Sequence, residues 1–323
     1  MLAIGCSADS LDSDLRMADT TIIESLKRFI RAVVNLFKAE YMRRPNGQDI
    51  SRLLDTAARR GFPGMIGSID CMHWAWEKCP TGWQGMYKGH EHRPTIILEA
   101  VAGPDLWFWH AFFGLLGSLN DINVLHRSPV FDDLATGNAP QVNFTVNGHA
   151  YGMGYYLADG IYPDWATLVK GIHCPVSEKH MLFTLKQAEY RKDVERAFGV
   201  LQAKFAVVKG PARMWYPNDL KYIMDCCVIL HNMAVEDERG MNQLDKDQYE
   251  PTEPVPHLLP KDSRTIDQLI EKHKQIESQS THYQLQEDLI QHVWAQHGPR
   301  RGNSTAAGST AIFLSLHTLF PLV

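Results

Sequence analysis

The chain has 323 residues, of which 45% are hydrophobic and 21% are charged, and these proportions exclude a protein that is disordered throughout. Its net charge of −5 argues against a protein that coats nucleic acid through bulk electrostatics. The charge is uneven, because residues 178–221 hold nine Lys/Arg and five Asp/Glu, whereas residues 236–288 hold six and thirteen. The sequence is therefore compatible with a locally basic surface that contacts nucleic acid.

Nothing in the sequence predicts export or a membrane segment. The six cysteines form no C-x-x-C pair and no dense disulfide pattern, which favours a reducing compartment, cytosol or nucleus. The chain does not open on a basic region followed by an apolar one, so we expect no secretory signal. The apolar stretch 311–323 has 13 residues, fewer than the roughly 20 that span a bilayer.

The first sixty residues are predicted to be helical after a disordered start at 1–17. Apolar residues recur with helical period from Thr20 to Tyr41, and a second helix is predicted over 49–59. Together these helices form an N-terminal remnant, residues 18–59, before the main domain.

Short apolar runs then predict strands. The runs at 65–70 and 155–159 each close on an acid, Asp70 and Asp159, and read as buried strands that carry the acid at their carboxyl ends. Residues 95–102 and 106–113 predict a hairpin, 121–125 a helical turn and 142–146 a weak strand. If the two acid-bearing strands are parallel neighbours, a ligand should bind beyond their carboxyl ends.

Helices dominate the second half. A long helix is predicted over 187–208, another over 220–236, and one exposed helix over 265–297. We therefore divide the chain into a main domain at 60–240 and an acidic, partly helical tail at 241–323 with a disordered end. The fold class is α/β, a mixed sheet flanked by helices.

The chemistry depends on Asp70, Asp159 and Glu195 taken together. Carboxylate oxygens are the ligands that Mg²⁺ prefers, and two such ions hold the attacking and leaving oxygens of a phosphoryl displacement. Singly, each acid is weak evidence, because Asp after a strand is more often a turn or cap residue. Glu beside Arg on a helix is usually a solvated ion pair. Only their joint placement points to a metal site.

Other residue patterns favour ordinary packing. The spacings of Cys71, His73, Cys79, His90 and His92 match no zinc pattern, so we expect packed or surface roles for them. Three tryptophans could stack on unpaired bases, but core or loop packing is the more frequent role; they are Trp74, Trp76 and Trp83.

Six blocks of the chain resemble the PIF/Harbinger transposase family in its plant transposon-protein branch. They are RGFPGMIGSIDCMHW at 60–74, PTIILEAVA at 94–102, NDINVL at 120–125, GYYLADGIYP at 154–163, RKDVERAFGVLQ at 191–202 and ILHNM at 229–233. They follow the family's order and extend over more than half of the chain. One loop departs from it, since the family's PGSNND reads LGSLND at 116–121, which keeps Asp121.

The resemblance implies a ribonuclease-H-like core with a DDE triad, in which Asp70, Asp159 and Glu195 are catalytic and hold a divalent metal, Mg²⁺ or else Mn²⁺. Asp121 is a candidate accessory ligand, although a helix cap is the commoner role for such a residue. Candidate contacts to the DNA backbone are Arg191, Lys192 and Arg196.

The activity that the resemblance implies is that of a DNA endonuclease, with strand transfer as a further reaction of the family. The alternative is a decayed or domesticated relative that binds DNA or protein without cutting. The implied partners are DNA and a Myb-like DNA-binding protein, and the chain could also form oligomers. The expected location is the nucleus, or the cytoplasm until a partner binds.

Overall fold

The computed structural model describes residues 1–139, 142–243 and 266–299. The helices are α1 (Asp9–Leu15), α2 (Asp19–Tyr41), α3 (Gly47–Arg59), α4 (Gln84–Tyr87), α5 (Asp121–Leu125), η1 (Pro129–Phe131), α6 (Asp132–Thr136), α7 (Glu178–Arg191), α8 (Asp193–Lys204), α9 (Ala206–Lys209), α10 (Pro217–Gln243), α11 (Ile266–Ile276) and α12 (Gln279–His297). The strands are β1 (Met65–Ala75), β2 (Thr95–Ala102), β3 (Phe108–Leu116), β4 (Phe144–Val146), β5 (His149–Tyr151), β6 (Tyr155–Leu157) and β7 (Leu168–Val169).

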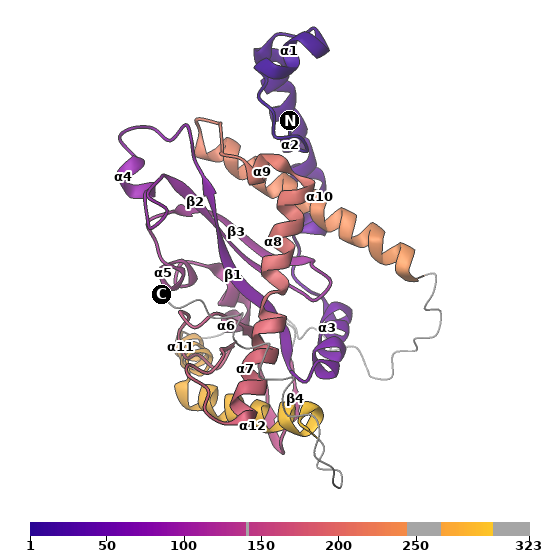
Figure 1. Cartoon of the computed structure of the whole chain (residues 1–323), viewed down its shortest axis with the longest axis vertical. Coiled ribbons are helices and arrows are strands. Elements are labelled where there is room, and N and C mark those ends of the chain that lie inside the picture. Colours follow the sequence, from indigo (N-terminus) through magenta and orange to yellow (C-terminus); the bar gives the residue numbers. More distant parts are fainter. Residues whose placement is uncertain (140–141, 244–265, 300–323) are drawn as a thin grey trace, which may run out of the picture.

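A mixed five-stranded sheet forms the centre, in the order β3-β2-β1-β6-β7. Strands β1, β2 and β3 are antiparallel neighbours, whereas β6 and β7 run parallel to β1. Helices α7 and α8 follow one another across the sheet in Figure 1, and α11 and α12 lie at the end away from α1. The predicted α/β class, a mixed sheet flanked by helices, is confirmed.

Helix α10 closes the open edge of the sheet through Asn232. Its side-chain amide accepts a hydrogen bond from the Phe108 backbone N–H at 2.9 Å and donates to the Phe108 carbonyl at 3.0 Å. The same amide donates to the Tyr41 carbonyl at 2.7 Å. Because β3 is an edge strand, these bonds satisfy backbone groups that have no neighbouring strand.

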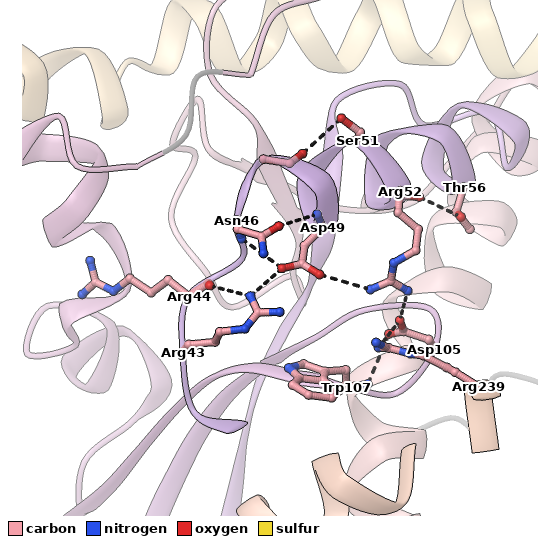
Figure 2. A network of polar contacts seen from close by, with 11 residues as sticks. Arg43, Arg44, Asn46, Asp49, Ser51, Arg52, Thr56, Asp105, Trp107 and Arg239 are labelled. Atoms are coloured by element: carbon pink, nitrogen blue, oxygen red, sulfur yellow. Dashed lines mark hydrogen bonds and ion pairs between the residues drawn. The ribbon is translucent and has the colours of Figure 1, made fainter. Parts of the chain in front are cut away.

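The N-terminal helices are built into the main domain. Asn46 and Asp49 form a reciprocal capping box that starts α3. Figure 2 shows Arg52 of α3 and Arg239 of α10 meeting at Asp105, in the turn between β2 and β3. The remnant predicted over 18–59 is therefore tied to the sheet by ion pairs as well as by packing.

The two ends of the described chain differ from the sequence prediction. Residues 1–17, predicted to be disordered, contain α1, and the backbone carbonyl of Ala3 accepts a hydrogen bond from Ala206 N–H at 3.1 Å. The predicted exposed helix at 265–297 is two helices, because Ser278 caps a new one. Leu289 and Val293 of α12 are fully buried against the Phe183 side of α7. Residues 300–323 of the predicted tail lie outside the described part of the chain.

No helix among the described residues is both long enough and apolar enough to cross a membrane.

Candidate active site

The sheet register brings Asp70 and Asp159 to the same level at two neighbouring parallel strands. Ser68 of β1 pairs with Leu157, the last residue of β6. Asp70 lies two residues further along β1, and Asp159 lies two residues beyond the end of β6. Residues two apart on a strand share a face, so Ser68 and Asp70 point to the same side of the sheet. The predicted parallel pairing of the two strands is confirmed, but the prediction that the second strand extends to Asp159 is wrong, because β6 ends at Leu157.

The prediction that β1 ends at Asp70 is wrong. Strand β1 continues to Ala75, because the antiparallel pairing with β2 runs from Ser68 to Ala75. The parallel pairing with β6, in contrast, stops at Ser68. Asp70 therefore lies just beyond the point where the pairing with one of its two neighbouring strands ends.

Glu195 is placed by a break in the helix that crosses the sheet. The helix predicted over 187–208 is interrupted at Lys192, which ends α7 and begins α8. The buried hydroxyl of Ser68 accepts a hydrogen bond from the Val194 N–H at 3.0 Å. In a continuous helix this N–H would donate to the carbonyl four residues earlier. A side chain that inserts into the helical hydrogen bonds is a known cause of such a break.

The break directs Glu195 towards Asp70, and Arg191 lies between them. Arg191 Nη1 is 2.7 Å from Glu195 Oε1 and 3.9 Å from Asp70 Oδ2. The side chain of Asp70 is 20% exposed and that of Glu195 is 40% exposed. Asp159 is exposed, and its Oδ1 accepts a hydrogen bond from the Gly160 N–H at 2.7 Å. All three acids are therefore reachable from solvent.

The electrostatics of Asp70 reflect crowding by other acids. The pKa of Asp70 is raised to about 6, mainly by burial and to a smaller extent by the negative charges of Asp121 and Glu195. The Cys71 backbone N–H and the Arg191 guanidinium act in the opposite direction without reversing the shift. A carboxylate that is costly to ionise next to like charges is stabilised by a bound cation.

Asp121 joins the same group of acids. It is the first residue of α5, and burial raises the pKa of its carboxyl, as does the charge of Asp159. The expected cap role is wrong for Asp121, because the cap is Asn120, whose side chain accepts a hydrogen bond from Asn123 N–H. The carboxyl of Asp121 is therefore free of a capping role and interacts with the acids of the site.

Comparison with known proteins decides the family. The sequence profile of the family described as plant transposon protein matches residues 39–242. The chain belongs to this plant transposon protein family.

Individual relatives of the family are distant. The chain is 26% identical over 193 residues to "Protein ALP1-like" of Arabidopsis thaliana. The matched residues make up 55% of this chain and 45% of the relative. It is 22% identical over 244 residues to "Putative nuclease HARBI1" of Bos taurus, covering 72% of this chain and 61% of the relative. The chain thus spans about half to three fifths of these curated relatives. No solved structure matches it.

The chain belongs to a Harbinger-derived, transposase-like family, and whether it can hold a divalent metal depends on its own side chains. Hard carboxylate oxygens are the right donors for Mg²⁺ or Mn²⁺, and Asp70, Asp159 and Glu195 supply them. Within the described residues, however, no three His, Cys, Asp or Glu side chains are arranged to hold an ion as they stand. The donor set fits the ion, and the side chains must converge further to bind it.

The basic residues predicted to contact DNA have different surroundings. Lys192 is exposed. Arg196 forms an ion pair with the buried Asp193, which also accepts a hydrogen bond from Arg60 at 2.6 Å. Arg191 contacts the carboxylates of the site itself. Of the three residues, Lys192 is thus the one whose surroundings leave it open to a backbone phosphate.

Most of the residues weighed for zinc or base stacking are packed, as expected. Trp74 and Trp76 are buried and donate hydrogen bonds to the backbone carbonyls of Gly210 and Met214. Trp83 is the exposed one, at 42%. His73 bonds to Thr95 Oγ1 at 2.9 Å, Cys79 is buried, and Cys71 is partly buried beside the Tyr162 hydroxyl. The remaining two, His90 and His92, are exposed.

Two features of the site escaped the sequence prediction. Ser68 was not singled out, although its position two residues before Asp70 places it on the same strand face. Arg191 is predicted to contact DNA, whereas the structure pairs it with Glu195 and Asp70; its spacing of four residues from Glu195 is that of a helical ion pair. In both cases the available signal is the local spacing from one of the candidate acids.

Proposed function

We propose that this chain is a transposase-derived, divalent-metal-dependent DNA endonuclease. The observation that carries the proposal is the register of two adjacent parallel strands, which puts Asp70 on β1 level with Asp159 just beyond the end of β6, together with the break at Lys192 that directs Glu195 to Asp70. The relatives named as nucleases support it. So does the mixed sheet flanked by helices, which is what a ribonuclease-H-like DDE core requires.

Asp70, Asp159 and Glu195 would hold the metal, Mg²⁺ or Mn²⁺, with Asp121 as an accessory group. The bound ions would supply Lewis acidity and orient the attacking oxygen in line with the scissile phosphate. The chain's own part is to fix the three carboxylates: β1 and β6 position the aspartates, and the Ser68 hydroxyl sets the direction of Glu195. No side chain need act as the nucleophile, because water or a DNA 3′-hydroxyl attacks the phosphorus.

We propose that the substrate is a duplex DNA end and that the protein acts in the nucleus. Lys192 is exposed beside the site, where a cation would contact a backbone phosphate without reading sequence. Recognition of a particular DNA end would then come from a Myb-like partner protein. These assignments are proposals that follow from the family and the charge of the site.

Cleavage of a terminal-repeat duplex by the purified chain, with the partner and Mg²⁺ or Mn²⁺, tests the proposal. We expect Asp70→Asn, Asp159→Asn and Glu195→Gln each to lower the cleavage rate by about a hundredfold or more, since each removes a metal ligand. Glu189→Gln is the matched control, because this exposed acid on α7 pairs with Lys186 and is outside the site.

Equal cleavage by the wild type and Asp159→Asn would contradict the proposal. So would binding of the duplex by the wild type without any cleavage in either metal. The second result would favour the alternative of a relative that binds DNA without cutting it.

A further inference from the structure

Arg191 occupies an unusual place for the last residue of a helix. Its guanidinium contacts Glu195 on the next helix and Asp70 on β1 through the same nitrogen, Nη1, at 2.7 and 3.9 Å. Its side chain is only 18% exposed. One nitrogen thus lies where two of the three carboxylates of the site face each other.

An ordinary helical ion pair does not explain this arrangement. Pairs spaced by four residues usually lie on the solvent face of one helix and contribute only tenths of a kcal/mol. Here the pair spans the break at Lys192, the arginine is mostly buried, and it contacts a second acid from the sheet. A guanidinium held in this way is also not free to bind a DNA phosphate.

The surrounding negative charges explain what Arg191 does in the site. Asp70 interacts electrostatically with Asp121 and Glu195, and Asp121 interacts with Asp159. Arg191 is the cation that lowers the energy of ionised Asp70 within this group. A single positive charge leaves several carboxylates uncompensated, so a divalent ion is still attracted to the site.

We propose that the Arg191 guanidinium is an internal cation that stands in for a divalent ion between Asp70 and Glu195 and must leave these carboxylates when the ion binds. The inference rests on the proposed function, since it supposes that a metal binds there. The ion and the guanidinium compete for the same oxygens. Arg191 therefore stabilises the metal-free site and weakens metal binding, and its release frees a cation beside the site.

Calorimetric titration of the full chain with Mn²⁺ tests this competition. We expect Arg191→Gln to bind Mn²⁺ about tenfold more tightly than the wild type, because the ion no longer has to displace a guanidinium from the shared oxygens. Arg28→Gln is the matched control. It removes the same charge from an ordinary exposed ion pair with Glu24 on α2, and we expect its Mn²⁺ affinity to stay within about twofold of the wild type.

A second measurement covers loss of stability in the variant. The melting temperature is followed while Mn²⁺ is removed with a chelator. The melting temperature of Arg191→Gln should fall further than that of the wild type, because the metal-free carboxylates of the variant have no counter-ion. Suppose that Mn²⁺ binds the wild type, that Arg191→Gln binds it no more tightly, and that the melting temperature of the variant falls no further on chelation. The inference is then wrong and the proposed function stands. If neither protein binds Mn²⁺, both are wrong.

Discussion

Single residues set the geometry of the site, and Ser68 shows how. Its hydroxyl takes the Val194 N–H out of the helical hydrogen bonds, and the helix breaks at Lys192 as a result. The bond joins residues 126 positions apart, so local helical periodicity could not predict the break. The resemblance to the family could single out the three acids as candidates, but not the contact that directs Glu195 to Asp70.

Asp70 gives a prediction at the residue scale. Its folded pKa of about 6 lies above its ordinary value of 3.8, so folding is opposed once the pH exceeds the unfolded pKa. The cost grows until the pH passes the folded pKa. We expect Asp70→Asn to raise the free energy of unfolding of the metal-free protein by about 2 kcal/mol at pH 7.5, with the gain shrinking between about pH 6 and 4.

Urea denaturation in the presence of a chelator measures this difference at several pH values. Asp55→Asn, on the solvent side of α3, is the control, and its effect should not follow the same pH window. A gain for Asp70→Asn that is equally large at pH 4 and pH 7.5 would show that the raised pKa of Asp70 is not its cause.

Helix α12, near the end of the described chain, helps to complete the core, which the composition of this region did not predict. Asp288 of α12 is 2% exposed and accepts hydrogen bonds from Tyr151, His149 and Asn147 of the β4–β5 hairpin at 2.5, 2.8 and 3.2 Å. Burial raises the pKa of Asp288, but these hydrogen bonds outweigh it and hold the pKa below its usual value. The acidic composition of residues 236–288 suggested an exposed tail, whereas this acid is an anchor.

Removing the carboxylate of Asp288 should destabilise the β4–β5 hairpin. We expect Asp288→Ala to lower the free energy of unfolding by about 3 kcal/mol, since it leaves several donors of the hairpin without their charged acceptor. Amide hydrogen exchange of residues 144–151 should speed up more than that of β1. Glu287→Ala, an exposed neighbour on α12, should do neither. Unchanged exchange in the hairpin would contradict the role assigned to Asp288.

At the scale of the whole molecule, the sequence predicted most elements and their class. Residues 95–102 and 121–125 were predicted with their observed bounds, because turn residues flank each of them. Strands β5 and β7 were missed, since they have only three and two residues and show no periodicity. The division at residue 240 also fails to describe the packing, because α12 packs against α7 on the main domain.

The central claim is that Asp70, Asp159 and Glu195 meet at a divalent ion. Anomalous X-ray diffraction from crystals of the chain grown with Mn²⁺ tests it most directly. The account predicts an anomalous peak within about 2.5 Å of carboxylate oxygens of Asp70 and Asp159, with the Arg191 guanidinium withdrawn from Asp70. No peak between these aspartates at saturating Mn²⁺, or a peak bound only by acids elsewhere on the chain, would contradict the account.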